Sequence, residues 1–130
     1  MPLENSIRDS HHSFVGVVDD DPRVLESFEE LLAAGGYESL LFDSAEAFLD
    51  ANGFEKVDCL ISDIGMPAMS GWDLLRIART ELPSLPVILI TARDEDLSRE
   101  AIESRGARCL FRKPFDGKAL LATLDNILRR

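Results

Sequence analysis

Short apolar runs alternate with amphipathic stretches along this chain from residue 14 to its end. A continuous apolar run of four to six residues is typical of a buried strand, whereas apolar positions three and four residues apart are typical of a helix. The pattern predicts five strands, at 14–18, 37–42, 58–62, 86–90 and 108–111. It predicts five helices, at 22–34, 45–51, 71–81, 94–105 and a last one marked by Leu120, Leu121, Leu124, Ile127 and Leu128.

Capping residues support several of these helix boundaries. Asp21 is a favoured N-cap, and Pro22 suits the first helical position because its ring presets the backbone angle. Gly35 and Gly36 end the same helix, and Ser44 caps the next one. The helix at 94–105 has few apolar residues on one face, so we expect it to be lightly packed.

The order of these elements predicts an α/β fold. Strands that are apolar throughout, rather than alternating, are typical of a parallel sheet covered on both faces. Successive strand ends lie 20 to 28 residues apart, which suits right-handed crossover connections through helices. Five units are too few for a closed eight-unit barrel. We therefore predict an open, doubly wound sheet over residues 14–130, preceded by a flexible polar tail at 1–13.

Composition and charge exclude several function classes. The chain has 130 residues and a net charge of −10, which argues against direct nucleic acid binding. It has no apolar run of the roughly 18 residues that span a bilayer, and its start does not resemble a signal peptide. We therefore expect a cytoplasmic protein without membrane contact. Cys59 and Cys109 each lie in an apolar run, so we expect both to be reduced core residues.

The charge is unevenly distributed. Residues 1–65 hold 15 acidic and 3 basic residues, a net charge of −12, whereas residues 66–130 hold 9 acidic and 11 basic residues, a net charge of +2. Carboxylates are therefore concentrated in the first half of the chain.

Polar residues follow the predicted strands at the edge where open parallel sheets form their sites. They are Asp19, Asp20 and Asp21 after the first strand, Asp63 after the third, Thr91 after the fourth and Lys113 after the fifth. The helix cap accounts for Asp21. Each of the others alone has an ordinary explanation, such as a strand-end turn, a cap or a solvated lysine. Together they predict one crevice that contains three carboxylates, a hydroxyl and an ammonium.

Three converging carboxylates repel one another. At about 4 Å and an effective dielectric of 20, each close pair costs on the order of 4 kcal/mol. A bound divalent cation and Lys113 would offset that cost. Oxygen ligands without Cys or His favour Mg²⁺, with Mn²⁺ as an alternative. A cation and a lysine beside Asp63 would stabilise charge on a phosphoryl group while Asp63 acts as the nucleophile.

Four segments resemble, in order and spacing, the receiver domains of bacterial two-component response regulators. They are FVGVVDDDPRV, LISDIGMPAMSGWDLL, VILITAR and LFRKPF. The resemblance covers about residues 14–130 and extends to chemotaxis receivers, which implies a flavodoxin-like sheet with the strand order 2-1-3-4-5. The Ser44–Ala51 stretch and the KPF region resemble receivers of the nitrogen-fixation regulator type, which carry DNA-binding domains.

The resemblance implies a role for each candidate residue. Asp63 would be the phosphoacceptor, with Mg²⁺ held by Asp19, Asp20, Asp63 and the backbone carbonyl of Gly65. The remaining phosphoryl contacts would come from the Thr91 hydroxyl, the Ala92 amide and Lys113. The family usually holds the bond between this lysine and the next proline, here Pro114, in cis.

The resemblance also implies partners and an output. The phosphodonor would be a sensor histidine kinase or a histidine phosphotransfer protein. Phosphorylation would change the face formed by the fourth helix, fifth strand and fifth helix, which a downstream protein, an effector domain or a second copy in a phosphorylation-dependent dimer would read. The chain would be a signalling domain rather than an enzyme, either standing alone or cut from a longer regulator.

One position departs from the family pattern. The family places an aromatic switch residue three positions before the lysine, where this chain has Leu110. The next residue, Phe111, faces the opposite side of the strand and is expected to be core. Two positions that set phosphoryl lifetime in the family correspond to Gly65 and Arg93.

Two alternative functions stay open. A metal-dependent phosphatase with an Asp nucleophile would also use an Asp-x-Asp spacing after the first strand, but Arg23 stands where that family has Thr or Val. A receiver-like interaction module that is not phosphorylated is favoured only by Leu110. A nucleotide- or flavin-binding domain fits the fold class, but no glycine-rich phosphate loop follows the first strand.

Overall fold

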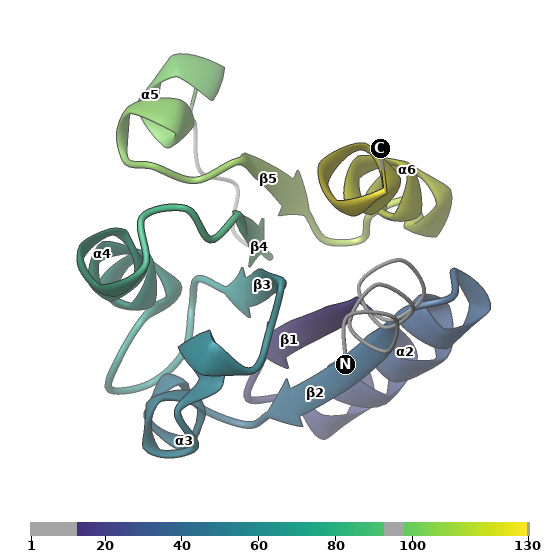
Figure 1. The fold of residues 1–130 in the computed structure, drawn as a ribbon, viewed down its shortest axis with the longest axis horizontal. Helices are drawn as coiled ribbons and strands as arrows, with labels where there is room; N and C mark the ends of the chain where they lie inside the picture. Colours follow the sequence, from purple (N-terminus) through teal and green to yellow (C-terminus); the bar gives the residue numbers. More distant parts are fainter. Residues whose placement is uncertain (1–12, 93–97, 130) are drawn as a thin grey trace, which may run out of the picture.

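Five parallel strands form a single sheet of order β2-β1-β3-β4-β5 in the computed structural model, which describes residues 13–92 and 98–129 (Figure 1). The strands are β1 (Phe14–Val18), β2 (Glu38–Phe42), β3 (Cys59–Asp63), β4 (Val87–Thr91) and β5 (Cys109–Arg112). The helices are α2 (Pro22–Ala34), α3 (Ala45–Asp50), α4 (Gly71–Glu81), α5 (Arg99–Ser104) and α6 (Gly117–Leu128), with a 3-10 turn η1 (Gly53–Glu55). The predicted fold class and strand order are confirmed.

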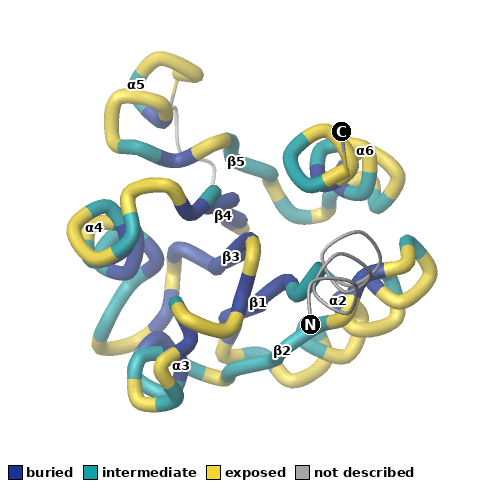
Figure 2. Tube along the Cα trace, viewed as in Figure 1, coloured by how far each residue is buried: buried dark blue, intermediate teal, exposed yellow. Residues whose placement is uncertain are grey.

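Helices cover both faces of the sheet. Figure 1 shows α2 and α6 on one face and α3 and α4 on the other, with α5 beside the β5 edge. Two separate apolar clusters result, because neighbouring residues on a strand face opposite sides. On β3, Leu60 belongs to the cluster under α3 and α4, and Ile61 belongs to the cluster under α2 and α6. The middle strands are the most buried part of the chain (Figure 2).

The predicted ends of α2 are confirmed by their contacts. The Asp21 side chain accepts a hydrogen bond from the backbone N–H of Arg23, and Pro22 occupies the first turn. Gly35 caps the other end, and Gly36 has a φ of 86°, a conformation that glycine adopts without steric cost. The predicted Ser44 cap of α3 is also present.

Three strands lie one residue further along the chain than the pattern predicts. β3, β4 and β5 each begin and end one residue later, so that Asp63 and Thr91 are the last residues of their strands. The reason is the ladder itself, in which Asp63 pairs with Ile90 and Thr91 pairs with Arg112. Hydropathy ended each strand at its last apolar residue, whereas backbone pairing continues through the polar one.

Other boundaries differ slightly from the prediction. The strand predicted from residue 37 begins at Glu38, the helix predicted to residue 51 ends at Asp50, and the η1 turn was not predicted. The fourth helix begins at Arg99, because the Ser98 side chain accepts a hydrogen bond from Ala101 N–H and caps it there. Residues 93–97, which include Arg93, and residues 1–12 of the predicted tail lie outside the described residues.

Several packing predictions are confirmed. Within α5 only Ile102 is buried, so that helix is lightly packed. Cys59 and Cys109 are both free thiols on strands. Phe111 packs with the cluster under α2 and α6, whereas Leu110 packs with the opposite cluster. None of the helices in the described residues is long and apolar enough to cross a membrane.

One glycine holds α4 against the end of β3. Gly71 is the first residue of α4, and its N–H donates a hydrogen bond to the Ile64 carbonyl. A Cβ atom at this position would lie 2.4 Å from the backbone oxygen of Asp63. The close approach therefore admits only glycine unless the end of β3 moves.

We predict that Gly71→Ala lowers the free energy of unfolding by about 2 kcal/mol, since overpacking against backbone cannot relax by a rotamer change. Alanine normally stabilises a helix relative to glycine, so the sign of the effect is informative. Urea denaturation measures it. Gly117→Ala is the matched control, because its Cβ would meet only a methyl group of Leu31 at 2.9 Å. Equal effects in both variants would contradict the prediction.

Candidate functional site

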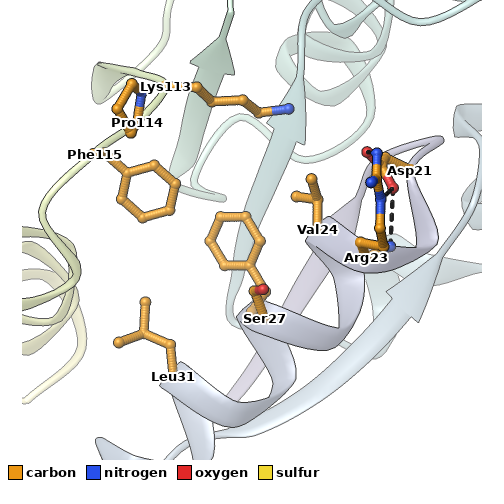
Figure 3. Close-up of a pocket in the computed structure, with 9 residues that line it drawn as sticks. Asp21, Arg23, Val24, Ser27, Leu31, Lys113, Pro114 and Phe115 are labelled. Carbon is orange, nitrogen blue, oxygen red and sulfur yellow. Dashed lines mark hydrogen bonds and ion pairs between the residues drawn. The ribbon is translucent and has the colours of Figure 1, made fainter.

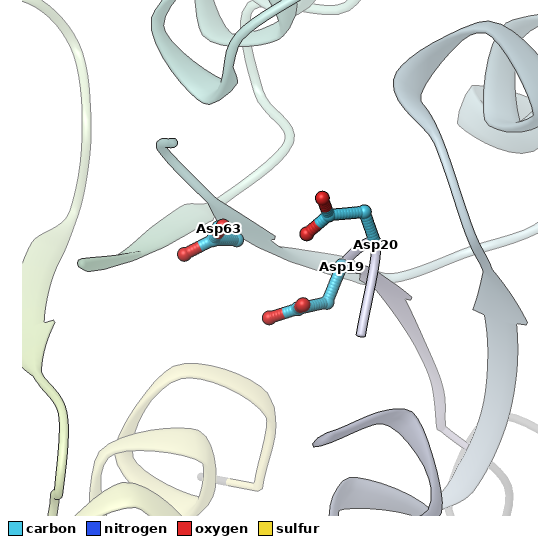
Figure 4. A group of neighbouring side chains, drawn as sticks. All are labelled: Asp19, Asp20 and Asp63. Carbon is cyan, nitrogen blue, oxygen red and sulfur yellow. The ribbon is translucent and has the colours of Figure 1, made fainter. Parts of the chain in front are cut away.

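The carboxylates of Asp19, Asp20 and Asp63 gather at the carboxyl edge of the sheet (Figure 4). β1 and β3 are neighbours with Val18 paired to Ser62, so Asp19 and Asp63 follow side by side. Each of the three residues offers a carboxylate oxygen, and these atoms all lie within 4.8 Å of one another. Asp19 and Asp63 are buried, at 2% and 7% exposure, and Asp20 is exposed. The cluster thus presents two buried acids and one that faces solvent.

Lys113 bridges the two buried carboxylates. Its Nζ donates a hydrogen bond to Asp19 Oδ2 at 3.0 Å and lies 3.4 Å from Asp63 Oδ1. The Lys113 backbone N–H donates to the Thr91 carbonyl at 2.8 Å, which ties the end of β5 to the end of β4. The peptide bond between Lys113 and Pro114 is cis, as the family resemblance implies.

Burial and charge shift the protonation of this pair in a defined way. Burial raises the pKa of Asp63, and the negative charge of Asp19 raises it further, against the opposing effect of Lys113. Burial lowers the pKa of Lys113, but the hydrogen bond and charge of Asp19, together with Asp63, outweigh it and the net shift is upward. Lys113 is therefore a cation at neutral pH.

The donor set fits a hard divalent cation. Three ionised carboxylates beside one ammonium leave two negative charges uncompensated within the cluster. All the side-chain donors are oxygens, as Mg²⁺ prefers. A divalent ion would neutralise the remaining charge and relieve the repulsion that raises the pKa of Asp63.

Asp21 supports the cluster without joining it. Its side chain caps α2 and pairs with Arg23 at 3.2 Å, whereas its backbone N–H donates to Asp19 Oδ1 at 2.9 Å. This amide holds one Asp19 oxygen while Lys113 holds the other. Sequence reasoning missed this contact because it depends on the turn between β1 and α2.

The other residues proposed from sequence lie at the same sheet edge. Thr91 is the last residue of β4, is 1% exposed, and directly follows Ile90, the ladder partner of Asp63. Ala92 comes next and is exposed. Gly65 is exposed in the loop between β3 and α4. The structure brings together four of the proposed residues: Asp19, Asp20, Asp63 and Lys113. It places Thr91, Ala92 and Gly65 at the same edge of the sheet through the strands that they end or follow.

A groove opens beside Lys113, between α2 and the segment that joins β5 to α6 (Figure 3). Its volume is about 550 Å³. The rings of Phe28 and Phe115 stack with centroids 5.3 Å apart, and Val24 and Leu31 add further apolar surface. Sequence analysis did not identify this groove, because its two walls are about 90 residues apart in the chain.

Comparison with known proteins supports a single family. The family model described as response regulator receiver domain matches residues 15–125. The response regulator protein FleR of Pseudomonas aeruginosa is 42% identical over 106 residues, which cover 81% of this chain and 22% of that protein. The transcriptional regulatory protein FixJ of Bradyrhizobium diazoefficiens is 34% identical over 115 residues, which cover 88% of this chain and 56% of that protein. The chain thus spans only part of these relatives.

Solved structures show the same architecture. A response regulator receiver domain protein from Clostridium thermocellum superposes with a TM-score of 0.83 at 28% identity, covering 91% of this chain and 95% of that one. The BeF3-activated DrrB receiver domain superposes with a TM-score of 0.81 at 30% identity, covering 92% and 99%.

We predict that Asp63→Asn raises the free energy of unfolding at pH 7 without divalent cations, by about 1 kcal/mol, since it removes a carboxylate from between like charges. Because the folded-state pKa of Asp63 is raised, its ionisation costs stability as the pH rises through that pKa. The gain should therefore shrink as the pH falls toward about 4, near the ordinary aspartate value.

Urea denaturation in the presence of a chelator, across this pH range, measures the effect. Asp43→Asn, at an exposed position just after β2, is the control and should leave stability unchanged. A loss of stability in Asp63→Asn at neutral pH would show that the carboxylate is not under electrostatic strain.

Proposed function

Because the chain belongs to the response regulator receiver domain family of two-component signalling, we propose that it accepts a phosphoryl group on Asp63 from a phosphohistidine of a partner protein. The observation that carries the proposal is a buried carboxylate, Asp63, in contact with Lys113 and beside two further carboxylates. Receiver domains bind Mg²⁺ at such a cluster of acidic residues. A site built this way serves phosphoryl transfer better than any other chemistry that its donors allow.

The transfer step uses residues already in place. An Asp63 carboxylate oxygen attacks the phosphorus, the bond between phosphorus and the donor imidazole nitrogen breaks, and that nitrogen leaves with the bonding electron pair. When bound by Asp19, Asp20, Asp63 and the Gly65 carbonyl, Mg²⁺ (or Mn²⁺) supplies positive charge for the phosphoryl oxygens. The bonds of Asp19 to Lys113 and to the Asp21 amide hold its carboxylate in position.

Residues in the second half of the chain would provide the remaining contacts to the phosphoryl oxygens. The Lys113 ammonium, now shared by two carboxylates, would pair with the phosphoryl group on Asp63. The Thr91 hydroxyl and the Ala92 amide would donate to the other oxygens, since Thr91 is the last residue of β4, the strand next to β3, and Ala92 follows it. Positive charge and donors placed around the transferring group stabilise its developing charge.

The groove beside Lys113 is the proposed approach of the phosphodonor protein. It runs along α2 and reaches Lys113, so a helix that carries the phosphohistidine could lie on its apolar wall. Half-buried Val24 and Phe115 would contact that helix, with buried Phe28 supporting the Phe115 ring from below and Arg23 at the rim. A sensor histidine kinase or a histidine phosphotransfer protein would fill this role.

Phosphorylation is proposed to act on the face formed by α5, β5 and α6. Lys113 directly follows β5 and pairs with Asp63 through its ammonium, so a change of charge at Asp63 reaches β5 through this side chain. α5 buries only Ile102, which makes it the helix most easily displaced. The chain itself acts as a switch for a downstream protein, an effector domain or a second copy, and not as a turnover enzyme.

Incubation with acetyl phosphate and Mg²⁺ tests the phosphoacceptor directly. We expect one phosphoryl adduct by intact mass, stable in acid and labile in base, that is absent in Asp63→Ala and absent with a chelator. Asp43→Ala is the matched control and should form the adduct normally, since this carboxylate follows the edge strand β2 and lies outside the cluster.

Adduct formation in Asp63→Ala would overturn the assignment. Release of phosphate from an added ester over many turnovers would instead support the alternative of an Asp-nucleophile phosphatase.

Lys113→Ala tests the coupling. We predict that the variant folds and still forms the adduct, but that phosphorylation no longer shifts the backbone amide resonances of α5 and β5. The physical reason is that the Lys113 ammonium, 3.4 Å from Asp63 Oδ1, links the residue that follows β5 directly to the phosphoacceptor. Lys118→Ala, at an exposed position on α6, is the control. A full response to phosphorylation in Lys113→Ala would contradict the mechanism.

A further inference from the structure

A second groove lies between α5 and β5, on the side of β5 away from the apolar groove along α2. Its volume is about 300 Å³, enough for a short segment of chain. One wall comes from α5 (Arg99, Ile102 and Glu103), and the other comes from Arg108 and the β5 residues Cys109, Leu110 and Arg112. Figure 1 shows α5 standing off from the sheet beside β5, the edge strand. Neither the acidic cluster nor the proposed phosphodonor surface includes any of these residues.

The rim of this groove is basic on a strongly acidic protein. Among the residues that the structure describes, three arginines and one glutamate line it, on a chain of net charge −10. Arg99 and Arg108 are exposed, and no acidic residue in 13–92 or 98–129 forms an ion pair with either of them. A rim of this kind attracts and orients carboxylates.

The floor of the groove is apolar. Ile102 is buried at 6% exposure, and half-buried Leu110 packs against the same cluster. Leucine at position 110 leaves more room than an aromatic side chain would occupy on the same wall. An apolar floor under a charged rim suits a ligand that combines one apolar side chain with carboxylates, as binding sites usually combine apolar contact with a few placed charges.

We propose that this groove binds an acidic segment of a partner protein, with an apolar side chain on Leu110 and Ile102 and carboxylates on Arg99 and Arg108. This names the chemistry of the downstream partner in the proposed function. Arg112 lines the groove, and the next residue, Lys113, pairs with Asp63. A ligand in the groove and a phosphoryl group on Asp63 would therefore both act on the same end of β5.

A protein segment fits better than nucleic acid for two reasons. The apolar floor is formed by the aliphatic side chains of Ile102 and Leu110 and suits a side chain of the same kind, whereas the phosphates of a nucleic acid could use only the rim. The net charge of −10 disfavours a long polyanion more than it disfavours a short acidic segment.

The test uses a synthetic heptapeptide, acetyl-Glu-Asp-Glu-Leu-Glu-Asp-Glu-amide, titrated into the ¹⁵N-labelled chain with and without acetyl phosphate and Mg²⁺. We expect amide shifts confined to α5 and β5. The double variant Arg99→Glu with Arg108→Glu should weaken binding at least about tenfold. Arg76→Glu, the same charge reversal at a single exposed site on α4, should leave affinity within about twofold. Leu110→Phe, which fills the floor, should weaken binding of this peptide but not of its Leu-to-Ser counterpart.

Several outcomes would overturn the proposal. They are the absence of shifts at millimolar peptide, equal weakening by Arg76→Glu, equal binding of the Leu-to-Ser peptide to the unaltered chain, or tighter binding of hexathymidylate at the same residues. The intact mass of the same samples reports phosphorylation of Asp63 independently. If the peptide does not bind but the adduct forms, the groove proposal fails and the proposed function stands. If the adduct does not form but the peptide binds, the proposed function fails and the groove proposal stands.

Discussion

The ammonium of Lys113 between two buried carboxylates is the interaction on which the site depends. Asp19 and Asp63 are each almost fully buried, and like charges so close would not both stay ionised without a cation. Lys113 compensates only part of that charge, because Asp20 adds a third carboxylate. The cluster is therefore left deficient in positive charge, and that deficiency suits it to a divalent cation, whose charge the proposed phosphoryl transfer would use.

The sheet topology makes this arrangement possible. β1, β3 and β4 are adjacent, so their carboxyl ends bring Asp19, Asp63 and Thr91 to one edge although they are far apart in sequence. These strands are buried on both faces, which gives the site a rigid base. By contrast, β5 is an edge strand and α5 has one buried residue. A rigid site thus lies beside a region that few contacts hold, as expected of a domain that converts a local charge change into a surface change.

The fold shows where the unevenly distributed charges of the sequence lie in space. Part of the acidic excess of the first half is the cluster itself, and Lys113 of the second half lies within it. Arginines of the second half surround the groove between α5 and β5. The carboxyl end of β5 therefore lies between the acidic cluster and the arginine-lined groove, which carry charges of opposite sign. The apolar groove along α2 is separate from both in composition, with stacked Phe28 and Phe115.

The sequence by itself determined the fold class, the strand order through family resemblance, and the identity of the acidic residues. The spacing of apolar residues indicates which positions are buried. Five strands that are buried on both faces, alternating with five amphipathic helices, are usually arranged as a parallel sheet between two layers of helices. Strand ends were misplaced by one residue at Asp63 and Thr91, because hydropathy cannot see backbone pairing.

The tertiary structure alone decided what depends on contacts between distant segments: the 3.0 Å bond from Lys113 to Asp19, the amide of Asp21 on the same carboxylate, and the approach of Gly71 to the Asp63 backbone. It also decided both grooves, since each is formed by walls from separate elements. The hydrophobic pattern of the sequence indicates which residues are buried. The distances between side chains, and the compensation of one charge by another, are determined only when the strands lie side by side.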